Sequence, residues 1–156
     1  MTEIPPDPNQ PPLILPWAIH EAMVAHCRLD APLEACGLLS GVGRSVQGIF
    51  LLRNREARTD RYDAEPLDLL HAWRCLRRQN QVIVGLYHSH PQWRAVPSRT
   101  DLERNYHGDT PRIIVSLLDQ QPDVRVWRLD AESYEEIPWR LSRDPVLHQT
   151  LDLSPP

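Results

Sequence analysis

The segment from Val82 to His88 reads Val-Ile-Val-Gly-Leu-Tyr-His and is apolar at almost every position. A continuous apolar run of this length is typical of a strand that is buried on both faces of a sheet. A sheet that is covered on both faces needs further layers of secondary structure around it. The segment therefore restricts the chain to a layered fold with a central sheet.

Two amphipathic patterns begin at prolines, Pro16 and Pro66, and proline suits the first turn of a helix. They predict helices over 17–29 and from residue 66 onward. The other expected elements are a hairpin of strands over 35–42 and 45–52, a short helix over 98–106, and strands over 112–118, 124–129 and 134–141. Because helices and strands interleave, we expect an α/β or mixed α+β fold with one central sheet.

The chain has 156 residues, which is enough for one domain. Six prolines lie within residues 1–16, and proline fixes the backbone and removes a hydrogen-bond donor. We therefore expect a disordered proline-rich tail over 1–15, a folded domain over 16–143 and a flexible tail over 144–156.

Composition narrows the class of protein further. The formal net charge is -4, which does not favour non-specific binding to nucleic acid. No apolar run approaches the roughly 18 residues of a membrane span, and the first residues do not resemble a secretory signal. The three cysteines are odd in number, lack a Cys-x-x-Cys pair and suit a reducing compartment: Cys27, Cys36 and Cys75. We therefore expect a cytoplasmic protein without nucleic-acid or membrane partners.

Candidate chemistry concentrates between His88 and Asp101. His88 and His90 lie two residues apart on the predicted strand, so both imidazoles project from one face. Asp101 follows a loop that contains two prolines, and it could add a carboxylate. Two histidines, one carboxylate and an open position for water form the ligand set of a catalytic zinc site. The alternatives are an incidental His-x-His pair and a helix-capping box formed by Ser98 and Asp101.

The segment fits the pattern H-x-H-P-x6-S-x2-D, which is the signature of the JAMM (MPN+) metalloprotease family. That family also has an upstream glutamate, commonly within P-x-E-x-C-G-h-L-x-G, and residues 32–41 here read Pro-Leu-Glu-Ala-Cys-Gly-Leu-Leu-Ser-Gly. The resemblance covers roughly residues 16–141. It implies the MPN fold, a single curved mixed sheet with flanking helices that is related to the fold of cytidine deaminases.

The resemblance also implies roles for individual residues. His88, His90 and Asp101 would bind one Zn²⁺ per chain, with water in the fourth position. Glu34 would act as general base toward that water and pass the proton to the leaving amine. Ser98 would donate a hydrogen bond to the developing oxyanion.

By the same resemblance, the substrate would be a ubiquitin-like or sulfur-carrier protein, cut after its C-terminal Gly-Gly at a peptide or isopeptide bond. The segments around the site are short, which favours small C-terminal appendages over polymer chains. Trp93 is a candidate wall over the tail, or else an anchor of its own loop. Four arginines of a polar loop could attract an acidic partner, or could simply be solvated: Arg53, Arg55, Arg58 and Arg61.

Two alternative functions stay open. A non-catalytic MPN scaffold would bind partners, although inactive members usually lose ligands and this chain keeps every expected one. A zinc deaminase would need H-x-E and P-C-x-x-C patterns, which the chain lacks. The sequence leaves both a monomer and a homodimer open.

Overall fold

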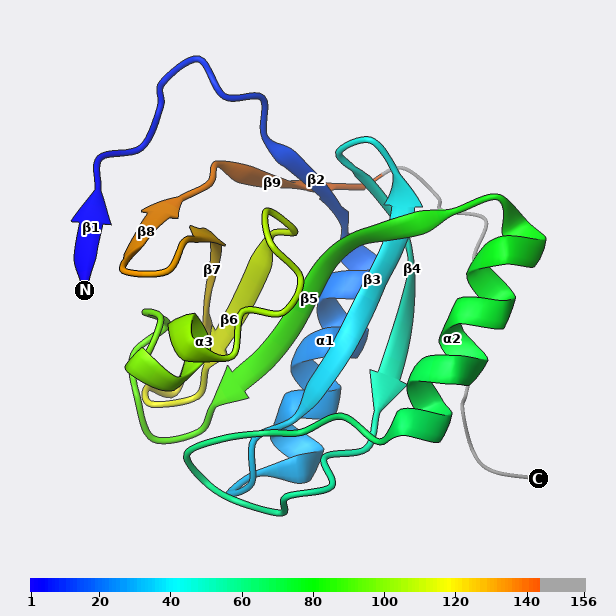
Figure 1. Ribbon diagram of the computed structural model, residues 1–156, viewed down its shortest axis with the longest axis horizontal. Helices are drawn as coiled ribbons and strands as arrows, with labels where there is room; N and C mark the ends of the chain where they lie inside the picture. Colours follow the sequence, from blue (N-terminus) through cyan, green and yellow to red (C-terminus); the bar gives the residue numbers. More distant parts are fainter. Residues whose placement is uncertain (144–156) are drawn as a thin grey trace.

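The computed structural model describes residues 1–143, and the expected flexible tail over 144–156 lies outside the described residues. Nine strands form one mixed sheet in the order β1-β8-β7-β6-β5-β3-β4-β2-β9 (Figure 1). This architecture confirms the expected mixed α+β class with a single sheet. Within the described residues, no helix is long and apolar enough to cross a membrane.

The middle of the sheet is formed by β3 (Cys36–Val42), β4 (Ser45–Leu52) and β5 (Val82–His90). β3 and β4 form the expected hairpin, and β3 also pairs antiparallel with β5. Gly37 lies opposite Tyr87, where a Cβ atom would come within 2.2 Å of the Tyr87 ring. The Tyr87 ring lies so close to the β3 backbone that only glycine, which has no Cβ atom, fits at this position.

Three further strands extend the sheet beyond β5. β6 (Arg112–Ser116) is parallel to β5, and β7 (Asp123–Leu129) and β8 (Ser133–Glu136) follow as antiparallel neighbours. Leu86 pairs with Arg112 and His88 with Ile114. Because directly paired residues share a face, Arg112 lies on the same face of the sheet as His88.

Helices cover both faces of this sheet (Figure 1). α1 (Trp17–Asp30) packs on one face, where its buried Met23 joins a core cluster that includes Tyr87 and Ile113. α2 (Pro66–Gln79) packs on the other face against β4 and β5. The short α3 (Arg99–Glu103) covers the same face over β6 and β7 through Leu102, Ile114 and Trp127. It ends earlier than the expected helix over 98–106.

The expectation of a disordered tail over 1–15 is wrong. β1 (Thr2–Ile4) pairs with β8, and β2 (Leu13–Pro16) pairs with β4 and β9. Leu13 and Leu15 are buried in the core. The apolar triplet between two prolines gains enough burial to order this segment, and a proline is tolerated at the end of a strand.

The expected single strand over 134–141 is divided at Pro138 into β8 and β9 (Trp139–Ser142). These two strands are adjacent in sequence but lie at or near opposite ends of the strand order. The sheet must therefore curl until its two ends approach each other, as Figure 1 shows for β8, β9 and β2.

Candidate metal centre

His88 and His90 lie at the carboxyl end of β5 and point from the same face, as their spacing predicts. Both side chains are almost completely buried. Their Nε2 atoms lie 3.1 Å apart, so the two imidazoles converge on one point. His90 is held in this orientation because its Nδ1 lies 2.8 Å from the carbonyl oxygen of Arg94, which leaves Nε2 free as a lone-pair donor.

Asp101 brings a carboxylate to the same point. Its Oδ1 lies 3.0 Å from His88 Nε2, and its Oδ2 lies 3.5 Å from His90 Nε2. The backbone N–H and the hydroxyl of Ser98 both donate to Oδ2, at 2.7 Å, and Ser98 Oγ accepts from the Asp101 N–H. The capping box and the convergence of Asp101 on the histidines therefore coexist, and the cap fixes the carboxylate.

The donor atoms of His88, His90 and Asp101 all lie within 4.8 Å of one another. Ligands at zinc–donor distances of about 2.0–2.1 Å in a tetrahedron are about 3.4 Å apart, which is close to the separations of 3.0, 3.1 and 3.5 Å found here. Two imidazoles and one carboxylate are also the donors that suit zinc. The residues present therefore fit a zinc ion.

The protonation states of His88 and Asp101 also suit a cation; burial would lower the pKa of His90 as well, but the facing Asp101 carboxylate raises it above its ordinary value. Burial lowers the pKa of His88. Burial alone would raise the pKa of Asp101, but the facing His88 and His90 hold it well below its ordinary range. A neutral imidazole and an ionised carboxylate are the forms that coordinate a metal.

Glu34 lies just before β3, and its side chain is only 3% exposed. Burial raises its pKa to about 8, with an opposing effect of His90 and a reinforcing effect of the Asp101 charge. The pairing of Cys36 with His88 and the hydrogen bond from the Ser89 N–H to the Ala35 carbonyl oxygen place Glu34 next to His90 in the register of β3 and β5. Ser89 holds this arrangement together from the opposite face of β5, because its hydroxyl accepts a 2.8 Å hydrogen bond from the Ala35 N–H.

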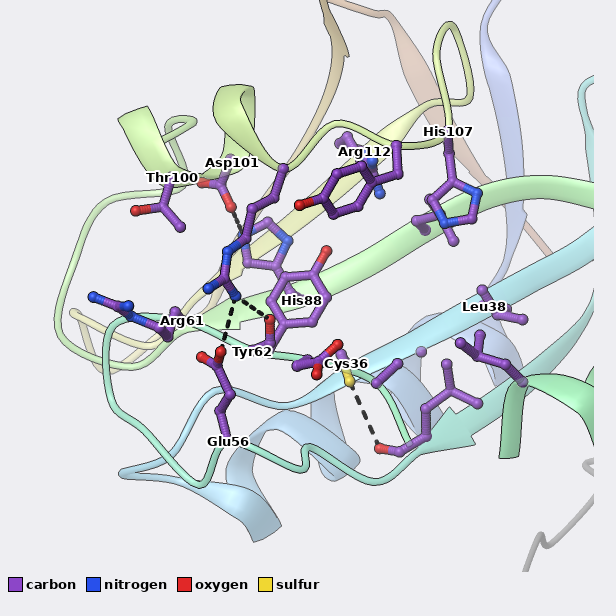
Figure 2. A pocket seen from close by; sticks show the side chains of 18 of the residues that line it. Cys36, Leu38, Glu56, Arg61, Tyr62, His88, Thr100, Asp101, His107 and Arg112 are labelled. Carbon is purple, nitrogen blue, oxygen red and sulfur yellow. Dashed lines mark hydrogen bonds and ion pairs between the residues drawn. The ribbon is translucent and has the colours of Figure 1, made fainter. Parts of the chain in front are cut away.

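A pocket of about 360 Å³ opens beside His88 and Asp101, between α2, α3 and the loop over 53–65 (Figure 2). Cys36 and Leu38 line part of it, and Cys36 packs in an apolar cluster with Leu38 and Phe50. Tyr62 stacks on His88 with ring centroids 4.9 Å apart. Figure 2 shows Tyr62 and Glu56 reaching the site from this loop.

Sequence reasoning missed several side chains of this pocket, above all Tyr62, Arg104 and Arg112. No local spacing connects them with the histidines. The only available signal for Tyr62 is that it is an aromatic residue in an otherwise polar, arginine-rich segment.

The arginines of that loop have partners within it or in α2. Arg53 pairs with Asp68, Arg55 with Asp63, and Arg58 and Arg61 with Asp60. They are therefore engaged in local ion pairs and are not a free positive patch.

Trp93 lies in the loop after His90 and is 62% exposed, so it is not an anchor packed against the domain. It does not line the pocket beside His88. The structure brings Glu34, Ser98 and the three metal-ligand candidates together and leaves Trp93 exposed, outside the residues that line the pocket.

One protein-family model and several relatives match this chain. The family model described as prokaryotic homologs of the JAB domain matches residues 16–130. The CysO-cysteine peptidase of Mycobacterium tuberculosis (strain ATCC 25618 / H37Rv) is 32% identical over 136 residues, covering 86% of this chain and 89% of that protein. A probable TtuB-protein conjugate cleaving protease of Thermus thermophilus is 36% identical over 92 residues, covering 58% of this chain and 62% of that protein.

Solved structures are similar as well. Protein DSY2949 from Desulfitobacterium hafniense has a TM-score of 0.79 and 28% identity, covering 86% of this chain and 96% of that one. AF2198, a JAB1/MPN domain protein from Archaeoglobus fulgidus, has a TM-score of 0.52 and 18% identity, covering 78% of this chain and 90% of that one. The second likeness shows the fold alone, and it confirms the expected MPN architecture.

Proposed function

Because the chain belongs to the family of prokaryotic homologues of the JAB domain, we propose that it is a zinc-dependent peptidase. It would hydrolyse the peptide or isopeptide bond after the C-terminal Gly-Gly of a ubiquitin-like or sulfur-carrier protein. The observation that carries this proposal is the convergence of His88, His90 and Asp101 within 4.8 Å, beside the buried Glu34.

A zinc ion held by His88, His90 and Asp101 would supply an activated water at neutral pH. Glu34 would accept a proton from that water and pass it to the leaving amine. Its pKa of about 8 without metal would fall beside a cation, because a nearby positive charge favours the carboxylate. The Ser98 hydroxyl would turn from Asp101 to donate to the developing oxyanion.

The proposed substrate class draws on the relatives. One relative is named a CysO-cysteine peptidase and another a probable TtuB-protein conjugate cleaving protease, so both names describe hydrolysis of a conjugate. The pocket of about 360 Å³ is small enough to select a thin peptide tail and too small for a folded domain. Trp93 would contact the same tail where it leaves the site.

The test is intact-mass spectrometry of a cleavage reaction by the zinc-loaded full chain. The substrate is a ubiquitin-like or sulfur-carrier protein from the same genome, extended by one residue beyond Gly-Gly. We expect loss of the extension alone, and we expect a chelator to abolish it. Glu34→Gln should keep zinc and lose activity by about 10²–10⁴-fold, the usual effect of removing a general base.

Two results would contradict the proposal. Full activity of Glu34→Gln would remove Glu34 from the mechanism. Absence of cleavage of both the extended carrier and a lysine-linked conjugate, with zinc bound, would indicate a partner-binding MPN scaffold instead of a peptidase.

A further inference from the structure

Arg112 is a buried cation in the wall of the pocket beside the metal centre. Its side chain is only 4% exposed, although it lies at the first position of β6. Figure 2 shows it on the same side of the pocket as Asp101 and His107. Burial, followed by the charge of Arg112, lowers the pKa of His107, which agrees with this proximity.

The guanidinium of Arg112 is incompletely satisfied. Nη2 donates a 2.8 Å hydrogen bond to Asn105 Oδ1, a neutral acceptor. Nε is buried and has no hydrogen-bond partner. No carboxylate among residues 1–143 lies within 4.0 Å of Arg112.

This situation contrasts with Arg104, which lines the same pocket. Arg104 donates to Glu56 Oε1 at 3.1 Å and to the carbonyl oxygen of Tyr62. A buried charge is costly unless it is paired and hydrogen-bonded, so a buried arginine without an anion is unusual. The pocket thus holds a fixed positive charge whose counter-ion is missing from the described part of the chain.

We infer that Arg112 binds the free carboxylate of the residue that is released from the carrier tail. This inference rests on the proposed function and names a specificity-determining residue for it. A guanidinium matches a carboxylate because it presents two parallel N–H donors to two oxygens.

The spacing along the sheet permits this contact. Arg112 is paired with Leu86, two residues before His88, which corresponds to about 7 Å along the strand. In a residue joined through its α-amine, the carboxylate lies two bonds from the scissile nitrogen. Hydrolysis adds the hydroxyl of water to the glycine carbonyl carbon and a proton to the departing nitrogen, so the carboxylate stays intact throughout.

An isopeptide-linked lysine offers no such group. Its reacting nitrogen lies at the end of a four-carbon side chain, and its own carboxyl carbon is part of the target's backbone. Arg112 would therefore favour carriers that bear a single terminal residue over conjugates with lysine side chains. A buried cation also disfavours a substrate that places another positive charge or an uncharged amide against it.

The test compares two carriers that differ in one group. Both end in Gly-Gly-Ala, one with a free carboxylate and one with a carboxamide. Charge-assisted hydrogen bonds are strong enough that we expect the zinc-loaded wild type to favour the carboxylate by about tenfold or more in kcat/KM. Arg112→Met should remove this preference by slowing cleavage of the carboxylate form alone, and Arg112→Lys should restore part of it.

Arg78→Met is the matched control, because it removes an exposed arginine on α2 outside the pocket and should keep the full preference. Equal cleavage of both carriers by the wild type would overturn the inference. An equal loss on both carriers in Arg112→Met would also overturn it, since that result means a structural role.

Binding of the same two carriers to zinc-loaded Glu34→Gln separates this inference from the proposed function. If the carboxylate form binds more tightly but the wild type cleaves neither carrier, the assignment of Arg112 holds and the peptidase proposal fails. If the two forms bind alike, the assignment of Arg112 fails whatever the turnover.

Discussion

At the scale of single residues, Asp101 connects the metal centre with the start of α3. One carboxylate oxygen accepts two hydrogen bonds from Ser98, and the other lies 3.0 Å from His88. A change at Asp101 therefore affects both the stability of the helix start and the affinity for metal. A change of the Ser98 side chain removes the cap and one of the two hydrogen bonds that hold the Asp101 carboxylate, but it removes no ligand.

This separation yields a prediction for zinc content. Asp101→Ala should lower zinc affinity by more than about 100-fold, because a ligand contributes more than the outer partners whose loss costs about 10–100-fold. Ser98→Ala should lower zinc affinity by less than Asp101→Ala, because the Ser98 backbone N–H still holds the carboxylate, and it should lose about 1 kcal/mol of stability, as expected for a lost cap. Zinc content by mass spectrometry and the unfolding midpoint measure the two effects. Stoichiometric zinc in purified Asp101→Ala would contradict the ligand assignment.

The residues that sequence analysis found share one property, which is a fixed local spacing. His88 and His90 alternate on one strand, and Ser98 and Asp101 lie three residues apart at a helix start. Tyr62 and Arg112 reach the same pocket from a loop and from a parallel neighbouring strand. These residues are far from the histidines in the sequence, so no local spacing predicts that they lie in the same pocket. Only the three-dimensional structure identifies them.

At the scale of elements, β2 is the strongest departure from the expected organisation. Its prolines indicated a tail, but Leu13, Ile14 and Leu15 form a strand that pairs with β9 along its whole length. Parallel partners distant in sequence, as β2 and β9 are, leave no turn signal between them. The hairpin of β3 and β4, by contrast, was predictable because its turn is local.

Leu15→Ala tests whether this segment belongs to the core. The side chain is fully buried, so its truncation should cost about 2–5 kcal/mol in unfolding free energy. Ile4→Ala in β1 is a suitable comparison, because Ile4 is exposed and should cost within about 0.5 kcal/mol. Urea unfolding of both variants measures the difference. A Leu15→Ala variant as stable as wild type would mean that residues 1–15 are a tail and do not belong to the core.

At the scale of the whole molecule, the two faces of the sheet differ in what covers them and in how tightly they are packed. The face under α1 holds the larger apolar cluster, and the face under α2 and α3 is opened by the pocket and the metal centre. The face under α1 nevertheless contains buried polar contacts, among them the 2.7 Å contact between His26 Nδ1 and the Tyr87 hydroxyl. His26 Nε2 also lies 3.3 Å from the Asp30 carboxylate, which would partly stabilise a positive charge on the imidazole.

The burial of His26 gives the whole molecule a dependence of stability on pH. Burial lowers the pKa of His26, and Asp30 opposes that effect without cancelling it. The unfolded chain therefore binds a proton at a higher pH, near 6.5, than the folded one. The contribution of His26 is fully present above about pH 6.5 and is lost as the pH falls through the folded pKa.

His26→Gln should accordingly make the fall of unfolding free energy between pH 7 and pH 5 shallower than in the wild type. The difference in slope has an upper limit of about 1.4 kcal/mol per pH unit, the value for one proton. His88 titrates in both proteins and cancels from the comparison. Above about pH 7.5 the two stability curves should run parallel, because His26 is neutral there in both states. Curves that stay parallel down to pH 5 would mean that His26 titrates alike in the folded and unfolded chains.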